Sequence, residues 1–215
     1  MSAHNVISIM LVDDHAVVRA GIRRLLVQET HMNVVAEAES AERAYQIFGE
    51  HLPDITIMDL NMPGMGGMEG IKRIVARYPT AKILVLSMHE NAAFASQALK
   101  AGAKGYLAKS GLAEELSNAI DWVLSGQTYL GKEVAQKIAS QLSESKNDPM
   151  QELSAREFEI FRMLVDGVEL GKIATTLNIS LKTVANYQTG IKQKLGVNSP
   201  VEMVRLAIRC GLIES

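Results

Sequence analysis

Four short apolar runs in the first half of the chain each end beside a residue with a charged or reactive side chain. The runs span residues 6–12, 55–58, 83–86 and 105–108. The residues that follow them are, in order, Asp13 with Asp14, then Asp59, Ser87 and Lys109. Helical patterns separate the runs, and this alternation predicts a parallel sheet with helices on both faces. Because the carboxyl ends of parallel strands share one edge of the sheet, we expect these five side chains to meet there.

Three carboxylates, a hydroxyl and an amine in one pocket suit a divalent cation and a phosphoryl group. The carboxylates repel one another unless a cation lies among them, and Mg²⁺ prefers such oxygen ligands. Phosphoryl transfer depends mainly on positioning and on neutralisation of charge, which Lys109 and Ser87 are suited to provide. We therefore expect Asp59 to accept the phosphoryl group. The alternative is that the three acids are ordinary loop residues near helix N-termini.

The strand-helix alternation stops after residue 126, and a different pattern follows. A helix is expected over residues 134–142, and residues 143–149 hold no apolar side chain, which is typical of a linker. Ser154 and Glu157 form a capping-box pattern that opens a helix. Helical segments at 170–177 and 181–195, joined by a short turn, predict a helix-turn-helix, and a fourth helix begins at Pro200. We expect a doubly wound five-stranded α/β domain at 1–127, a linker at 128–149 and a four-helix domain at 150–215.

The second helix of the expected helix-turn-helix has one apolar face and one polar face. Val184, Tyr187, Ile191 and Leu195 share a face that is expected to pack inward. Residues 171–201 carry four lysines and no acidic residue, which favours contact with DNA phosphates. The alternative is a plain solvent-exposed face of a small helical bundle. The candidate DNA-contacting residues are Lys182, Thr183, Ala185, Asn186, Thr189, Lys192 and Gln193.

Composition restricts the cellular setting. The single cysteine, Cys210, excludes an intrachain disulfide and fits a reducing compartment. No apolar stretch approaches the roughly 20 residues that a membrane span requires, and the N-terminus lacks a cleavable signal pattern. We expect a cytoplasmic protein that has no membrane partner.

The residues of the expected pocket resemble those of receiver domains in two-component response regulators. The resemblance rests on Asp13, Asp14, Asp59 with residues 62–64, Ser87 and residues 102–109. It implies a flavodoxin-like fold and a sensor histidine kinase that phosphorylates Asp59. It also implies that Ser87 and Tyr106 form a switch pair and that Lys109 contacts the phosphoryl group. By the same resemblance, Mg²⁺ is held by Asp13, Asp14, Asp59 and the backbone carbonyl of Asn61. Many receivers have proline where this chain has Ser110, so we expect a less rigid loop.

The tail resembles the LuxR-type DNA-binding domain through residues 153–157, 173–177, 179–184 and 194–197. Together the two parts resemble the NarL/FixJ family of response regulators, and residues 183–187 and 207–212 favour a GacA/UvrY-like branch. The resemblance implies binding to double-stranded DNA at inverted repeats by a homodimer, with the helix at 200–210 as a candidate interface. Many relatives have a basic residue at Ala185 or Thr189, so base contacts are expected either to be fewer or to shift to Asn186 and Gln193.

These observations predict a transcription factor in which phosphorylation of Asp59 promotes dimerisation, unmasks the helix-turn-helix, or does both. A magnesium-dependent aspartyl-phosphate phosphatase is an alternative. That chemistry usually needs a second acid two residues beyond the nucleophile, where this chain has Asn61 after Asp59 and His15 after Asp13. A regulator that does not respond to phosphorylation is a third possibility, and the intact acidic pocket argues against it. We therefore expect a regulator rather than an enzyme.

Overall fold

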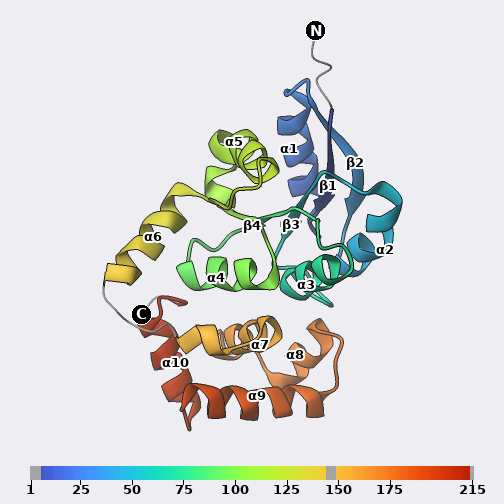
Figure 1. The fold of residues 1–215 in the computed structure, drawn as a ribbon. Coiled ribbons are helices and arrows are strands. Elements are labelled where there is room, and N and C mark those ends of the chain that lie inside the picture. The colour runs from blue at the N-terminus through green and yellow to red at the C-terminus, as the bar shows by residue number, and fades with distance from the viewer. Residues whose placement is uncertain (1–5, 144–148, 214–215) are drawn as a thin grey trace.

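The computed structural model describes residues 6–143 and 149–213. A parallel sheet lies at the centre of the N-terminal part, with the strand order β2-β1-β3-β4-β5-β6. This arrangement confirms the predicted doubly wound fold (Figure 1). The strands are β1 (Ile7–Val12), β2 (Met32–Ala38), β3 (Ile55–Asp59), β4 (Ile83–Ser87), β5 (Gly105–Ala108) and β6 (Tyr129–Leu130).

Helices cover both faces of the sheet because its central strands are apolar on both sides. Every residue of β3 and β4 is buried, as expected for inner strands of a parallel sheet. One apolar layer joins the sheet to α1 and α5, and the other joins it to α2, α3 and α4. These helices are α1 (Ala16–Val27), α2 (Ala41–His51), α3 (Gly67–Arg77), α4 (Ala92–Ala101) and α5 (Leu112–Leu124).

The strand order positions the candidate site. The chain runs from β1 outward to β2 and then crosses back to β3 on the other side of β1. Such a reversal leaves a crevice at the carboxyl ends of the two strands, where α/β proteins bind ligands. Asp13 and Asp14 follow β1, and Asp59 is the last residue of β3. Lys109 begins a short 3-10 helix, η1 (Lys109–Gly111), directly after β5.

The sheet has one strand more than the five expected. The two residues of β6 pair with Gly105 and Tyr106 of β5 at the edge of the sheet. This short strand lies in the segment expected to be linker, and two residues are too few to show a strand pattern in the sequence. A helix, α6 (Lys132–Ser143), follows it and agrees with the expected helix at 134–142. Most of the predicted linker at 143–149 lies outside the described residues.

The C-terminal part is helical, as predicted. Ser154 and Glu157 form the expected capping box at the start of α7, and Asn178 has the positive φ of 50° that lets the helix-turn-helix turn sharply. Across residues 6–143 and 149–213, every helix falls short of the length and apolar character that a membrane span requires. The elements are η2 (Pro149–Glu152), α7 (Ala155–Val165), α8 (Leu170–Thr176), α9 (Leu181–Leu195) and α10 (Pro200–Arg209).

The two parts share an interface in which η2 and α7 pack on α3 and α4 (Figure 1). The apolar layer under α4 continues into the core of the helical part. Gln97 of α4 is 3 % exposed, and its amide donates hydrogen bonds to the carbonyls of Met150 and Leu153. Arg156 of α7 donates to the carbonyl of Met65, 3.2 Å away, in the loop that follows β3. The docking therefore combines apolar burial with hydrogen bonds to backbone carbonyls.

A substitution at Gly67 tests how closely α3 approaches the end of β3. A β-carbon at this position would overlap the carbonyl oxygen of Asp59 and the α-carbon of Leu60. We expect Gly67→Ala to lower the free energy of unfolding by about 1–3 kcal/mol, the usual cost of overpacking, as measured by urea denaturation. Gly21→Ala is the control, because nothing lies within 4 Å of its added carbon, and it should stabilise α1 by about 0.5–1 kcal/mol. Equal effects of the two substitutions would contradict the close approach.

Candidate functional site

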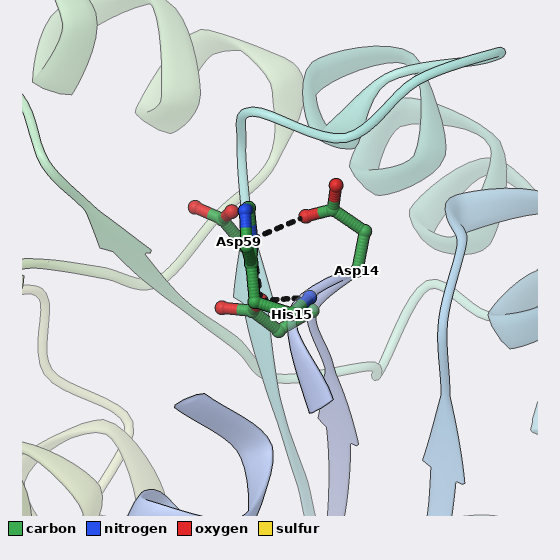
Figure 2. A group of neighbouring side chains, drawn as sticks. Asp14, His15 and Asp59 are labelled. Carbon is green, nitrogen blue, oxygen red and sulfur yellow. Dashed lines mark hydrogen bonds and ion pairs between the residues drawn. The ribbon is translucent and has the colours of Figure 1, made fainter. Parts of the chain in front are cut away.

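The structure brings the predicted carboxylates together at the carboxyl edge of the sheet. Figure 2 shows Asp14 and His15, which follow β1, beside Asp59 at the end of β3. Asp13, Asp14, His15 and Asp59 each offer a ligand atom, and these atoms all lie within 4.8 Å of one another. His15 was not among the predicted site residues, and its Nδ1 lies 2.9 Å from Oδ1 of Asp14. Asn61 follows in the loop after β3.

Lys109 supplies the positive charge inside this cluster. Its Nζ lies 2.8 Å from Oδ2 of Asp13 and 3.3 Å from Oδ2 of Asp59, and both carboxylates are 2 % exposed. Burial raises the pKa of Asp59, the ammonium of Lys109 opposes this shift, and the nearby charge of Asp13 adds to it. Burial disfavours the charged form of Lys109, but its hydrogen bond to Asp13 and the charge of Asp59 prevail and raise its pKa. The ammonium of Lys109 therefore pairs with two of the three carboxylates in the cluster.

The donor set fits a hard divalent cation. Oδ1 of Asp14 is buried and accepts no hydrogen bond from the described residues. Uncompensated carboxylate oxygens that lie this close repel one another, and Mg²⁺ prefers such oxygen ligands. A cavity of about 330 Å³ lies beside the cluster, and its lining includes Asp14 and Asn61 from the N-terminal part and Arg162 from α7. The site thus has both the ligands for a cation and an adjoining space.

The two residues of the predicted switch pair are buried, and both form hydrogen bonds with the backbone of His89. Ser87 ends β4, and its Oγ accepts a hydrogen bond of 3.1 Å from the backbone N–H of His89. The hydroxyl of Tyr106 on β5 donates to the carbonyl of His89 over 2.7 Å. Burial raises the pKa of Tyr106, so the phenol remains a neutral donor. His89 was missed in the sequence because its importance depends on these contacts. Ser110, at the position where receivers often have proline, donates to Glu90.

The candidate DNA-contacting residues all lie on α9. Val184 and Ile191 are buried, and Tyr187 and Leu195 are half-buried, so this face packs inward as predicted. The hydroxyl of Thr183 lies 2.8 Å from that of Ser180 at the helix N-cap, and that of Thr189 donates to the carbonyl of Ala185. Figure 1 shows α9 on the side of the helical part that is remote from α3 and α4. Lys182, Asn186, Thr189 and Gln193 are exposed, and Thr183, Ala185 and Lys192 are half-buried.

The last helix, α10, has both buried and exposed apolar residues. Met203 and Leu206 pack into the helical part, whereas Val201 is 60 % exposed and Ile208 is 37 % exposed. Beyond the helix, the carbonyls of Cys210 and Gly211 accept hydrogen bonds from the side-chain amide of Asn91, the N-cap of α4. The exposed positions leave apolar surface available on α10, and its C-terminal end is attached to the N-terminal part.

Two family models match the chain. Residues 9–121 match the response regulator receiver domain, and residues 151–207 match the luxR family of bacterial regulatory proteins. The chain therefore belongs to the two-component response regulators of the NarL/FixJ type, which combine a receiver with a LuxR-type DNA-binding domain and regulate transcription.

Individual relatives agree with this assignment. The chain is 39 % identical to the response regulator UvrY of Escherichia coli over 208 residues, which cover 96 % of this chain and 95 % of UvrY. It is 35 % identical to the response regulator GacA of Pseudomonas aeruginosa over 211 residues, with 97 % and 99 % covered. It is thus GacA/UvrY-like.

Solved structures share the fold. RcsB from Salmonella enterica serovar Typhimurium, bound to a promoter in the presence of the phosphomimetic BeF₃⁻, is 29 % identical with a TM-score of 0.72, covering 94 % of this chain and 98 % of that one. A LuxR-family two-component response regulator from Aurantimonas is 43 % identical with a TM-score of 0.63, covering 64 % of this chain and 99 % of that one.

The raised pKa of Asp59 predicts a pH-dependent effect on stability. At neutral pH the ionised carboxylate is buried at a cost, so Asp59→Asn should raise Tm in the absence of divalent cations. A relief of about 1 kcal/mol corresponds to roughly 2–4 °C for a chain of this size. As the pH falls through the raised native pKa toward 3.8, the native protein takes up the proton and the difference should shrink.

Thermal unfolding between pH 4 and pH 7.5 measures this difference. The exposed Asp121 provides the control, since Asp121→Asn removes a carboxylate without relieving burial. A lower Tm for Asp59→Asn at neutral pH, or a difference that does not vary with pH, would contradict the prediction.

Proposed function

We propose that Asp59 is the residue that a sensor histidine kinase phosphorylates. The observation that carries this proposal is the burial of the Asp59 carboxylate at the strand crossover, with the ammonium of Lys109 3.3 Å away. An oxygen of Asp59 attacks the phosphorus of a phosphohistidine. The new O–P bond forms as the P–N bond breaks, and the departing imidazole nitrogen takes up a proton. Lys109 then offsets charge on the phosphoryl oxygens, because its pKa is raised and it stays protonated.

The cation ligands we propose are Asp13, Asp14, Asp59 and the backbone carbonyl of Asn61, with Mg²⁺ as the ion. The buried Oδ1 of Asp14, which lies 2.9 Å from Nδ1 of His15 but accepts no hydrogen bond from the described residues, supports this assignment. Bound Mg²⁺ offsets the negative charge that the phosphoryl group brings into the pocket. Lys109 cannot do this alone, since it already pairs with Asp13.

Ser87 and Tyr106 respond to the phosphoryl group in this proposal. The Ser87 hydroxyl accepts a hydrogen bond from His89 and is free to turn and donate to a phosphoryl oxygen. Tyr106 then rotates into the space that Ser87 leaves. Because both residues are buried in the core, this change alters how neighbouring helices pack and shifts a two-state equilibrium.

The C-terminal part binds double-stranded DNA through α9. Its exposed face carries Lys182, Asn186 and Gln193, which suit phosphate contact and base recognition. Two copies bind inverted repeats and pair through residues 200–210, where Val201 and Ile208 are exposed. The functional units are residues 1–127 and 150–215, joined by 128–149. A regulator that binds chromosomal DNA acts in the cytoplasm.

Phosphorylation of Asp59 is tested by labelling with acetyl phosphate and Mg²⁺. Asp59→Ala should abolish the acid-stable, base-labile shift on a phosphate-affinity gel, because the acceptor oxygen is gone. Asp121→Ala, which removes an exposed carboxylate on α5, should be labelled like the unaltered chain. Persistent labelling of Asp59→Ala would place the acceptor elsewhere. A genome-wide binding map of both proteins then shows whether phosphorylation governs the DNA targets.

The phosphate contact of Lys182 is tested by the salt dependence of DNA binding. Lys182→Ala should weaken binding to all sequences to a similar extent and reduce the slope of log K against log salt by about 1. Lys104→Ala is the matched control, because this exposed lysine lies in the N-terminal part. Fluorescence anisotropy at several salt concentrations gives both slopes. An unchanged slope for Lys182→Ala would remove this residue from the interface.

A further inference from the structure

His89 forms hydrogen bonds with three residues of the proposed phosphorylation site. Its backbone N–H donates to Oγ of Ser87 over 3.1 Å, and its carbonyl accepts from the hydroxyl of Tyr106 over 2.7 Å. Its ring Nε2 lies 3.2 Å from the side-chain nitrogen of Asn61. A change in the switch pair therefore acts directly on the backbone of His89.

The ring of His89 extends this connection to the helical part. It stacks on Phe94 of α4, with ring centroids 4.1 Å apart and an interplanar angle of 11°. Phe94 in turn meets Phe158 of α7 edge to face, at 4.9 Å and 83°. Phe94 is 4 % exposed and Phe158 is 1 % exposed, so neither ring can move without disturbing its neighbours. Three aromatic rings thus form a continuous contact from the switch pair to α7.

Hydrogen bonds near the aromatic rings make the contact between Phe94 and Phe158 depend on the position of α4. The buried amide of Gln97 donates to the carbonyl of Leu153 over 3.2 Å, and Nζ of Lys100 donates to that of Gln151 over 2.7 Å. These side chains project from the same helix as Phe94 and hold the segment that leads into α7. A displacement of Phe94 and its helix therefore changes the aromatic contact and the hydrogen bonds together.

We propose that the ring of His89 couples the switch pair to the docking of η2 and α7 on α4, so that phosphorylation loosens this docking. The inference rests on the proposed phosphorylation of Asp59. When Ser87 turns to a phosphoryl oxygen and Tyr106 rotates into the space that Ser87 leaves, the backbone of His89 loses its hydrogen bonds to both side chains. The ring of His89, which is stacked on Phe94, then shifts and displaces Phe94 from its contact with Phe158.

The docking restrains the position of the helical part. It does not cover α9. Helix α9 lies on the side of the helical part that is away from α3 and α4 (Figure 1), whereas the backbone carbonyls after α10 accept hydrogen bonds from Asn91 at the start of α4. Loosened docking frees α10 and the rest of the helical part to pair with a second copy. His89 is thus a positioning residue that acts through Phe94 and Phe158.

Hydrogen–deuterium exchange of the full chain tests this coupling at the backbone amides of residues 150–158. In the unaltered chain, acetyl phosphate with Mg²⁺ should speed exchange by roughly 5- to 150-fold, the usual range of coupling between two sites. His89→Ala keeps the backbone bonds and removes the ring, so exchange should stay slow in both states. His89→Phe restores a ring and should restore the response. Met88→Ala is the control, because the side chain of Met88 is 71 % exposed beside His89.

A phosphate-affinity gel on the same samples distinguishes a failure of the proposed function from a failure of the coupling through His89. If the unaltered chain is not phosphorylated, the proposed function fails. If it is phosphorylated and exchange does not change, the coupling alone fails. Phe158→Ala provides the undocked reference, with fast exchange in both states. The coupling through His89 is also overturned if His89→Ala responds like the unaltered chain, if it matches Phe158→Ala before phosphorylation, or if His89→Phe gives no response.

Discussion

The charge balance at the carboxyl edge of the sheet is the constraint on which the rest of the structure depends. Lys109 brings one ammonium to Asp13 and Asp59, and the oxygen of Asp14 remains buried without a hydrogen bond. Burial raises the pKa of Asp59, so the pocket holds negative charge at a cost. A divalent cation would relieve this imbalance, because it prefers carboxylate oxygens as ligands. The parallel strands keep these charged groups together, because the strand ends cannot separate without breaking the hydrogen bonds between strands.

A second constraint is the apolar layer that the two parts of the chain share. Phe94 and Phe158 belong to one cluster of buried residues that runs from the sheet through α4 into the helical part. Such a shared core packs well in few arrangements, so a small change near Ser87 is expected to select between states rather than to spread gradually. His89 lies where the polar pocket meets this apolar layer. The arrangement places the proposed phosphorylation site in contact, through His89 and Phe94, with the helices of the C-terminal part.

Much of the fold was predictable because local sequence patterns indicate its strands and helix ends. Central strands buried on both faces have continuous apolar runs, as in β3 and β4, and Ser154 with Glu157 has the spacing of a capping box. The strand β6 was not predicted, since two residues show no period. Gln97 and Arg156 were missed for another reason. Their partners are backbone carbonyls more than 20 residues away, and such acceptors leave no mark in a sequence.

The sequence by itself determined which residues make up the pocket and the candidate DNA-binding face. The residue after each strand is set by the chain order, and parallel pairing brings those ends to one edge in any sheet of this type. The tertiary structure alone decided that His89 joins Ser87 and Tyr106 to Phe94, and that α7 docks on α4 while α9 faces away. These features depend on contacts between distant segments, whose energies arise only once the layers are packed.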